Sequence, residues 1–380
     1  MNQTEQIFFQ AIQKSLWNTN ITFPEDTDWN AVLKEAESQA VLGIVIGVAP
    51  ADIRKEWQAR SSAGMAHFVR ILHYQEQLYK LLKENDIPMV ILKGTAATVY
   101  YPNPSQRTMG DIDYLVPLEH FDRAKDILQQ NGYSVSEDFR YLRHIDVGKD
   151  GISFEMHRFF SDAEADIDLF ITNDLCKAKE ANIYGSVFPM LPNLSNGLVL
   201  LAHLVHHLKT GVGLRQVIDW MMFADKELDD EFWYREFQSA AEQAGLKKVA
   251  VAATRMCQKY LGLSEEKRCW CMDVDEDLCD SLMENVLSSG NFGKKHGKGL
   301  RVEGAVNNLK KGGLRYLQTA GEYNWRAYHK YKWLKPFAWI YQIGRYAKQG
   351  FQTKRNRKQL QQDYDQASQR YKLLEKLGIY

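Results

Sequence analysis

Two short apolar segments with the character of strands, residues 88–92 and 111–116, lie in a chain whose apolar residues recur mostly with helical period. Each is shorter than a normal helix, and each adjoins a turn that contains glycine or proline. Helical period dominates before residue 86 and again after residue 194. A small mixed sheet with helices between its strands satisfies both patterns, so the sequence predicts an α+β fold with a helical C-terminal region.

Further elements follow from period and turn signals. Strands are expected at 141–147 and 152–159, because Asp150-Gly151 in the turn between them is a hairpin signal. Helices are expected at 29–39, 61–85, 117–131 (closed by Gly132), 198–208, 214–226 and 356–377. The predicted division is an N-terminal helical region (1–60), an α+β core (61–190), a helical domain (191–290) and a basic C-terminal segment of loop followed by helix (291–380).

Composition points to a soluble protein. The 380 residues are 45% hydrophobic and 25% charged, which is ordinary for globular domains. The first residues are polar, and the longest apolar stretch, 41–49, is about half of what a membrane span requires. Five cysteines without a repeated CxxC are typical of free thiols. We therefore expect a cytoplasmic protein.

Charge is unevenly distributed along a chain of zero net charge. Residues 291–360 contain 17 Lys or Arg and 2 acids, a net charge of about +15. Such a segment favours phosphate-bearing partners, namely a nucleic acid, a nucleotide or an anionic membrane surface. The alternative is a solvated helical face that pairs with the acidic remainder of the same chain.

Asp111 and Asp113 are the leading candidates for chemistry. Acids at i and i+2 on a strand point to the same face, where a divalent cation can neutralise them and bind a nucleotide's phosphates. The spacing alone is weak evidence, because it recurs at 166–168 and 273–275. What distinguishes this pair is its place among apolar strand residues; acids on a surface strand are the alternative.

Neighbouring residues complete the candidate site. Glu155 lies on the polar face of its predicted strand, where it can act as a third carboxylate or accept a proton. Gly94 lets the backbone approach a phosphate closely, and Thr95 adds a hydroxyl donor. Lys93 and Arg107 could each hold a triphosphate or pair with the aspartates; for Arg107 the alternative is a structural clamp on its loop.

Later residues offer weaker signals. His203 and His207 share a helix face with zinc-compatible spacing, but the glutamate of the metalloprotease pattern is missing, so a polar helix edge is the favoured interpretation. Arg215 and Asp219 have the spacing of an ion pair within one helix. Cys269 and Cys271 have no second pair suited to zinc.

The chain resembles a known family in its motifs. They are Leu92-Lys93-Gly94-Thr95-Ala96-Ala97, Tyr100-Tyr101-Pro102-Asn103-Pro104, Arg107-Thr108-Met109-Gly110-Asp111-Ile112-Asp113-Tyr114-Leu115-Val116 and Phe154-Glu155-Met156-His157, with His203, His207, Arg215 and Asp219. Together these motifs, spanning roughly residues 60–290, are similar to those of the bacterial uncharacterised nucleotidyltransferase family, of the polymerase-β-like superfamily.

The resemblance implies a metal-dependent transferase that moves a nucleoside monophosphate from an NTP to an acceptor. It assigns Mg²⁺ (or Mn²⁺) to Asp111, Asp113 and Glu155, and the phosphates to Gly94 and Thr95. The Lys-Gly-Thr turn departs from the superfamily's Gly-Ser and weakens the nucleotide-binding assignment. The resemblance names no acceptor, which could be a small molecule, a sugar, a protein or an RNA.

Two rival functions remain at this point. One is a non-catalytic module of the same fold, whose basic C-terminal segment binds nucleic acid or a protein partner. The other is a zinc hydrolase built on His203 and His207.

Overall fold

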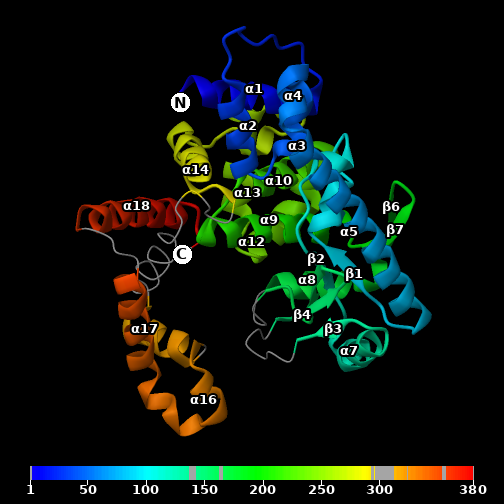
Figure 1. Ribbon diagram of the computed structural model, residues 1–380, viewed down its shortest axis with the longest axis vertical. Helices are drawn as coiled ribbons and strands as arrows, with labels where there is room; N and C mark the ends of the chain where they lie inside the picture. The colour runs from blue at the N-terminus through cyan, green and yellow to red at the C-terminus, as the bar shows by residue number, and fades with distance from the viewer. Residues whose placement is uncertain are drawn as a thin grey trace.

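A seven-stranded mixed sheet forms the core of the computed structural model, which describes residues 2–136, 143–161, 166–291, 295, 312–322, 324–352 and 357–379 (Figure 1). The strand order is β3-β4-β5-β2-β1-β7-β6. The strands are β1 (Val90–Leu92), β2 (Ile112–Leu115), β3 (Ser134–Val135), β4 (His144–Lys149), β5 (Ile152–His157), β6 (Lys179–Ile183) and β7 (Ser186–Met190). The first strand runs antiparallel to β2 and parallel to β7, while β2 and β5 are parallel. The α+β prediction is confirmed.

The predicted hairpin is present as β4 and β5. Its two-residue turn has φ of +50° at Asp150 and +75° at Gly151, the positive values that a tight hairpin turn requires. Arg70 and Tyr74 reach the turn from a neighbouring helix, donating to the carbonyl and carboxylate of Asp150 at 2.6 and 3.0 Å. The turn is thereby fixed from outside as well as by its own sequence.

The sequence analysis missed three strands. The β6–β7 hairpin turns at Tyr184 and Gly185, both with positive φ. Its strands do not alternate clearly between apolar and polar residues, and Pro189 argues against a strand by pattern alone. Pairing of β7 with β1, a contact distant in sequence, brings this hairpin into the sheet. The third, β3, has only two residues.

Helices make up most of the remaining chain. Their bounds are α1 (Gln3–Trp17), α2 (Trp29–Ser38), α3 (Leu42–Val45), α4 (Ala51–Glu56), α5 (Gln58–Glu84), α6 (Gly94–Thr98), α7 (Phe121–Gln130), α8 (Asp166–Asp174), α9 (Asn193–Thr210), α10 (Leu214–Glu227), α11 (Asp230–Phe232), α12 (Gln238–Gln243), α13 (Lys247–Leu261), α14 (Glu276–Ser289), α16 (Arg326–Lys330), α17 (Ala338–Gln352) and α18 (Arg357–Lys376). Short 3₁₀ segments are η1 (Ile46–Val48), η2 (Pro104–Gln106), η3 (Leu118–His120), η4 (Leu175–Lys177), η6 (Cys269–Cys271) and η8 (Lys332–Phe337), and η5 (Trp233–Phe237) is a π-helix.

Two apolar clusters cover the two faces of the sheet. Ile91, Ile112 and Tyr114 belong to the cluster that includes the buried side chains of α5 and α7. Leu92 and Leu115 belong to the other cluster, formed with the N-terminal helices and the helices after β7. Since side chains alternate along a strand, the acidic positions of β2 lie on this second face, towards α9 and α10.

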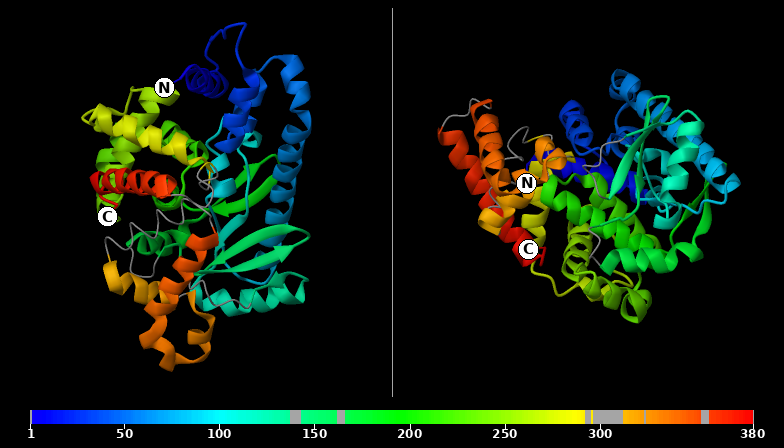
Figure 2. Two further views of the ribbon diagram at one scale, coloured as in Figure 1. Left: turned by 60° about the vertical axis from the view of Figure 1, so that its left-hand side comes forward. Right: turned by 90° about the horizontal axis from the view of Figure 1, so that it is seen from below.

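The helices of the first sixty residues and those of 191–290 contribute to the same apolar cluster. The boundary predicted at residue 60 stays a prediction, as does the rest of the domain division. The end of α18 joins this cluster through Leu373, Leu374 and Leu377, whereas α16 and α17 project away from the body (Figures 1 and 2).

Other expectations can be compared with the described part of the chain. It contains no helix that is long and apolar enough to cross a membrane. The five cysteines are free thiols, and three of them are buried. Of the basic segment, residues 292–294, 296–311, 323, 353–356 and 380 lie outside the described residues.

Candidate active site

Asp113 and Glu155 lie directly opposite each other on the parallel strands β2 and β5. Leu92, the last residue of β1, is opposite Asp113 on the other side. Side chains that face each other across a ladder point to one face of the sheet. The two carboxylates therefore share the face that the alternation of the sequence predicts, and Asp111 precedes β2 by one residue.

Lys93 and Asp113 form a buried ion pair. Lys93 Nζ lies 2.7 Å from Asp113 Oδ1, and the two side chains are 13% and 8% exposed. Burial opposes ionisation of Asp113, but Lys93 and a hydrogen bond from His157 outweigh it and hold the pKa of the carboxyl well below its usual range. The backbone of Lys93 has φ of +51°, a conformation that side-chain-bearing residues rarely adopt and that is concentrated at functional sites.

Asp111 is exposed to the adjoining cavity. Desolvation by the cavity walls and the negative charge of Asp113 raise the pKa of its carboxyl, while Lys93 opposes the rise. Asp111, Asp113 and Glu155 all line the same cavity as Lys93. This excess of negative charge and the oxygen donors fit a divalent cation.

Two histidines adjoin Glu155. His157 Nε2 lies 3.3 Å from Glu155 Oε2 and 3.0 Å from Asp113 Oδ1, and His144 Nε2 lies 3.7 Å from Glu155 Oε1. The potential ligand atoms of His144, Glu155 and His157 all lie within 4.8 Å of one another. Burial opposes protonation of His157, but its hydrogen bonds to Asp113 and Glu155 raise its pKa.

The turn after β1 leads directly into α6. Gly94, at the start of that helix, has φ of +37°, which favours glycine at this position. Thr95 is 1% exposed, and its hydroxyl donates to Gln75 Oε1 at 2.6 Å. That hydroxyl is therefore engaged in the core and is not one of the groups lining the cavity. The hydroxyl donor that the sequence predicts at Thr95 is therefore not presented to the cavity.

Arg107 is buried against Asp219 of α10. Its Nε and Nη2 donate to the two oxygens of Asp219, each at 2.7 Å, and Tyr101 also donates to that carboxylate at 2.7 Å. Arg215 Nη1 donates to the Thr108 carbonyl at 3.3 Å. The sequence analysis pairs Asp219 with Arg215 within α10, but the Asp219 carboxylate binds Arg107 in the loop before β2. This geometry favours the clamp interpretation of Arg107.

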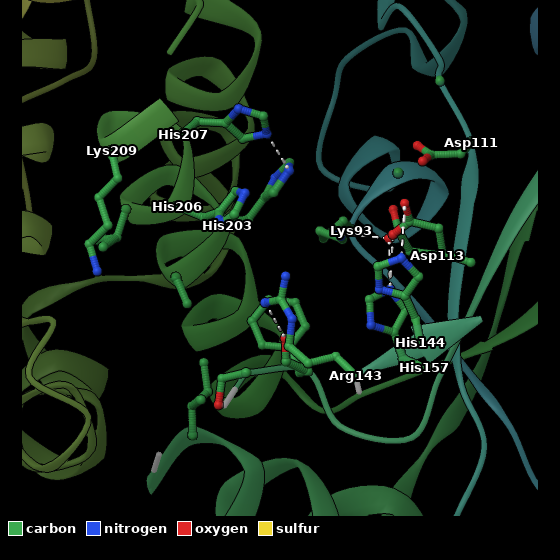
Figure 3. A pocket seen from close by; sticks show the side chains of 18 of the residues that line it. Lys93, Asp111, Asp113, Arg143, His144, His157, His203, His206, His207 and Lys209 are labelled. Carbon is green, nitrogen blue, oxygen red and sulfur yellow. Dashed lines mark hydrogen bonds and ion pairs between the residues drawn. The ribbon is translucent and has the colours of Figure 1, made fainter. Parts of the chain in front are cut away.

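Histidines of α9 line the opposite wall of the cavity (Figure 3). His203 and His207 have their Nε2 atoms 3.0 Å apart. Burial lowers the pKa of both, to about 3 for His207, and the cations Lys93 and Arg215 add to the effect. The predicted polar helix edge therefore faces the cavity with neutral imidazoles.

The cavity between the sheet and α9 has a volume of about 490 Å³, within the range of small-molecule sites. It brings together these predicted residues: Lys93, Gly94, Arg107, Asp111, Asp113, Glu155, His203, His207 and Arg215. It also contains residues that the sequence analysis did not single out: Arg143, His144, Phe160, Ser161, His206 and Lys209.

A signal for His144 was present in the sequence. Counting outward from the two-residue turn Asp150-Gly151 pairs Asp146 with Glu155 and His144 with His157, as observed. Directly opposed residues share a face, so the hairpin signal alone places His144 beside the acidic site. Lys209 and His206 had no such signal, because helix packing brings them to the cavity.

Comparisons with known proteins identify a family for the chain. The family model for uncharacterised nucleotidyltransferases matches residues 25–262, more than half of the chain. A comparison with curated proteins found no match.

Among solved structures, the chain is similar to ANT(2")-Ia in complex with adenylyl-2"-tobramycin, with 13% identity, coverage of 45% of this chain and 97% of that one, and a TM-score of 0.34. It is also similar to an antigenic nucleotidyltransferase-like protein from Paracoccidioides brasiliensis, with 12% identity, coverage of 52% and 96%, and a TM-score of 0.34.

Proposed function

The chain belongs to the uncharacterised nucleotidyltransferase family, and on that premise we propose that it is a metal-dependent enzyme that moves a nucleoside monophosphate from an NTP to an acceptor. The observation that carries the proposal is the register of Asp113 with Glu155, beside Lys93, at one side of a cavity of about 490 Å³. The cavity is large enough for a nucleotide, and its acids lie together.

Each residue of the site has a role in this proposal. Asp111 and Asp113, with Glu155 as a candidate third ligand, would hold Mg²⁺ (or Mn²⁺), and the ion would supply positive charge to neutralise the triphosphate. When the nucleotide binds, Lys93 exchanges its ion pair with Asp113 for one with the phosphates. The backbone at Gly94 and Thr95 approaches those phosphates closely, since Gly94 has no side chain.

The acceptor binds on the α9 side of the cavity. Where Asp111 and Asp113 alone hold the ion, Glu155, the less buried of the two opposed carboxylates, accepts the proton of the acceptor hydroxyl as that oxygen bonds to the α-phosphate and pyrophosphate leaves. Arg107 keeps the loop before β2 in place through Asp219, and so fixes where Asp111 stands. Small molecules, sugars, protein side chains and RNA ends are the acceptor classes to screen.

The proposal is tested by calorimetry and turnover with each NTP and Mg²⁺. Asp111→Asn and Asp113→Asn are expected to abolish Mg²⁺-dependent NTP turnover. The exposed Asp111 variant should keep its thermal unfolding temperature, whereas the Asp113 variant should unfold cooperatively at a lower temperature, because buried Lys93 loses its counter-charge. The control is Asp273→Asn, an exposed acid with the same two-residue spacing to Asp275, outside the cavity. Full turnover by both site variants would overturn the mechanism.

A second role, as a binding module, is favoured by the projecting segment around α16 and α17. Its side chains include the exposed Trp333, Phe337 and Ile340, next to the exposed Lys332 and Lys335. Cations with interleaved aromatic rings suit a single-stranded nucleic acid. Salt-sensitive RNA binding without heat from any NTP would favour this role over catalysis.

A further inference from the structure

We propose that His144, Glu155 and His157 form a nitrogen-containing site for a divalent transition-metal ion, beside the carboxylates of Asp111 and Asp113. The inference deepens the proposed function, because it names a kind of ion for that cavity. Binding of the ion does not depend on turnover, so the two proposals can fail separately.

The geometry of the hairpin supports this site. His144 and His157 are a directly opposed pair on β4 and β5, and Glu155 precedes His157 by two residues on the same face. Each histidine approaches a different oxygen of Glu155, at 3.7 Å from Oε1 and 3.3 Å from Oε2. One hairpin therefore supplies all three ligand groups, and its tight turn fixes their register.

The orientation of His157 suits a metal ligand. Its Nδ1 faces the Phe159 carbonyl at 3.3 Å, while Nε2 faces the carboxylates. With Nδ1–H held by the carbonyl, a bound metal can take the place of the Nε2 proton that His157 shares with the carboxylates in the metal-free chain. The side chain is 4% exposed, so its ring is held in this orientation by its surroundings.

Ligand chemistry decides which ion fits. Mg²⁺ is bound through oxygen, whereas imidazole nitrogen suits zinc and other first-row transition metals. Two imidazoles with one carboxylate form a mixed set, and Asp113 Oδ1, 3.0 Å from His157 Nε2, is a further oxygen at its edge. The site therefore favours an ion such as Co²⁺, Ni²⁺ or Zn²⁺ over Mg²⁺.

The histidine pair on α9 is a weaker candidate for the same ion. His203 and His207 lie in the same cavity, with their Nε2 atoms 3.0 Å apart. Within the described residues, no third histidine, cysteine or carboxylate converges with them as the β4–β5 group does.

The first test measures metal binding to the full chain after dialysis against EDTA. Co²⁺ is expected to bind more tightly than Mg²⁺ in the absence of nucleotide, by at least about tenfold. His144→Gln and His157→Gln should each weaken Co²⁺ binding by on the order of 10–100-fold. His73→Gln, a change at an exposed histidine of α5, is the matched control and should bind Co²⁺ as the unaltered chain does.

A second measurement needs no variant and so does not depend on how buried substitutions fold. Pulsed EPR of the unaltered protein loaded with one equivalent of Cu²⁺, an ion that imidazole binds well, should show coupling to histidine nitrogen. Coupling to oxygen ligands and water alone would overturn the proposal. So would loss of Co²⁺ binding in His203→Gln/His207→Gln with full binding in His144→Gln, because the ion would then lie on α9.

The outcomes also separate this inference from the proposed function. Mg²⁺-dependent NTP turnover without a nitrogen-bound metal would reject the histidine site and leave the transferase standing. Nitrogen-bound Co²⁺ that depends on His144 and His157, with no binding of any NTP, would reject the transferase and leave the metal site standing.

Discussion

Asp113 Oδ1 lies 2.7 Å from Lys93 Nζ and 3.0 Å from His157 Nε2. In an isolated strand this carboxylate would be solvated by water, and the folded chain supplies these two groups instead. The low pKa that results keeps the negative charge in place for a cation. Lys93 therefore serves as the counter-charge of the site.

Removal of that counter-charge has a predictable effect. Lys93→Met leaves a buried carboxylate without its lysine partner, and loss of one member of a buried pair costs about 3–5 kcal/mol of unfolding free energy. Added Mg²⁺ should restore part of that loss, because the ion supplies positive charge at Asp113. Urea unfolding with and without Mg²⁺ measures both effects.

The control for Lys93→Met is Lys83→Met, which breaks an exposed pair with Glu180. Water screens such pairs, so the unfolding free energy should change little, and Mg²⁺ should make no difference specific to this variant. Equal losses in the two variants, or equal Mg²⁺ responses, would contradict the role given to Lys93.

The neutral histidines of α9 predict a pH dependence of stability. The folded-state pKa of His207 is about 3 and that of His203 is also lowered, against 6.5 for an ordinary histidine. Below about pH 6.5 the unfolded chain binds protons that the folded chain does not, so stability is lost as pH falls from there. In His203→Gln/His207→Gln, urea unfolding should show a smaller loss between about pH 7 and about pH 5; an unchanged slope would count against buried neutral imidazoles.

At the scale of elements, the β4–β5 hairpin positions His144, Glu155 and His157. Its turn residues adopt positive φ, and the two-residue loop sets every opposed pair from Lys149 and Ile152 to His144 and His157. The turn and its register are local properties, so they could be predicted from the sequence. The parallel pairing of β5 with β2 is not local, and it is what brings Glu155 to Asp113.

The link between the loop before β2 and α10 gives another prediction. Arg107→Met removes both hydrogen bonds that Arg107 donates to Asp219, with an expected cost of about 3–5 kcal/mol in unfolding free energy. If the clamp interpretation holds, Arg107→Met/Asp219→Leu should recover much of that stability, because no buried charge is left unpaired. Chemical unfolding of the single and double variants decides this. Unchanged stability with weaker NTP binding would instead make Arg107 a phosphate ligand.

At the scale of the whole molecule, the cavity exists because the acidic face of the sheet packs towards the helices that follow it. His203, His206 and Lys209 come from α9, more than forty residues after Glu155. Their approach depends on the apolar cluster shared by the N-terminal helices and α9–α14. No period or spacing in the sequence predicts that α9 lies against the acidic face of the sheet.

The projecting basic segment is tested at this scale. Lys332→Glu/Lys335→Glu/Lys348→Glu should weaken binding to a single-stranded RNA homopolymer. If each lysine contacts one phosphate, the slope of log affinity against log salt should become less steep by roughly 2. Reversal of three exposed lysines of the body, Lys80, Lys83 and Lys177, changes net charge equally and is the control. Equal effects of the two triple variants would show that net charge alone acts.

The sequence by itself determined the α+β class, the hairpin, the helices around the sheet and the shared face of the acidic positions, because period, turn residues and alternation act over a few residues. Tertiary structure alone decided which groups those acids meet. Lys93 pairs with Asp113, Thr95 turns its hydroxyl to Gln75, and Arg107 binds α10. Burial removes water from charged and polar side chains, and each must then take whichever partner the packing of distant segments supplies.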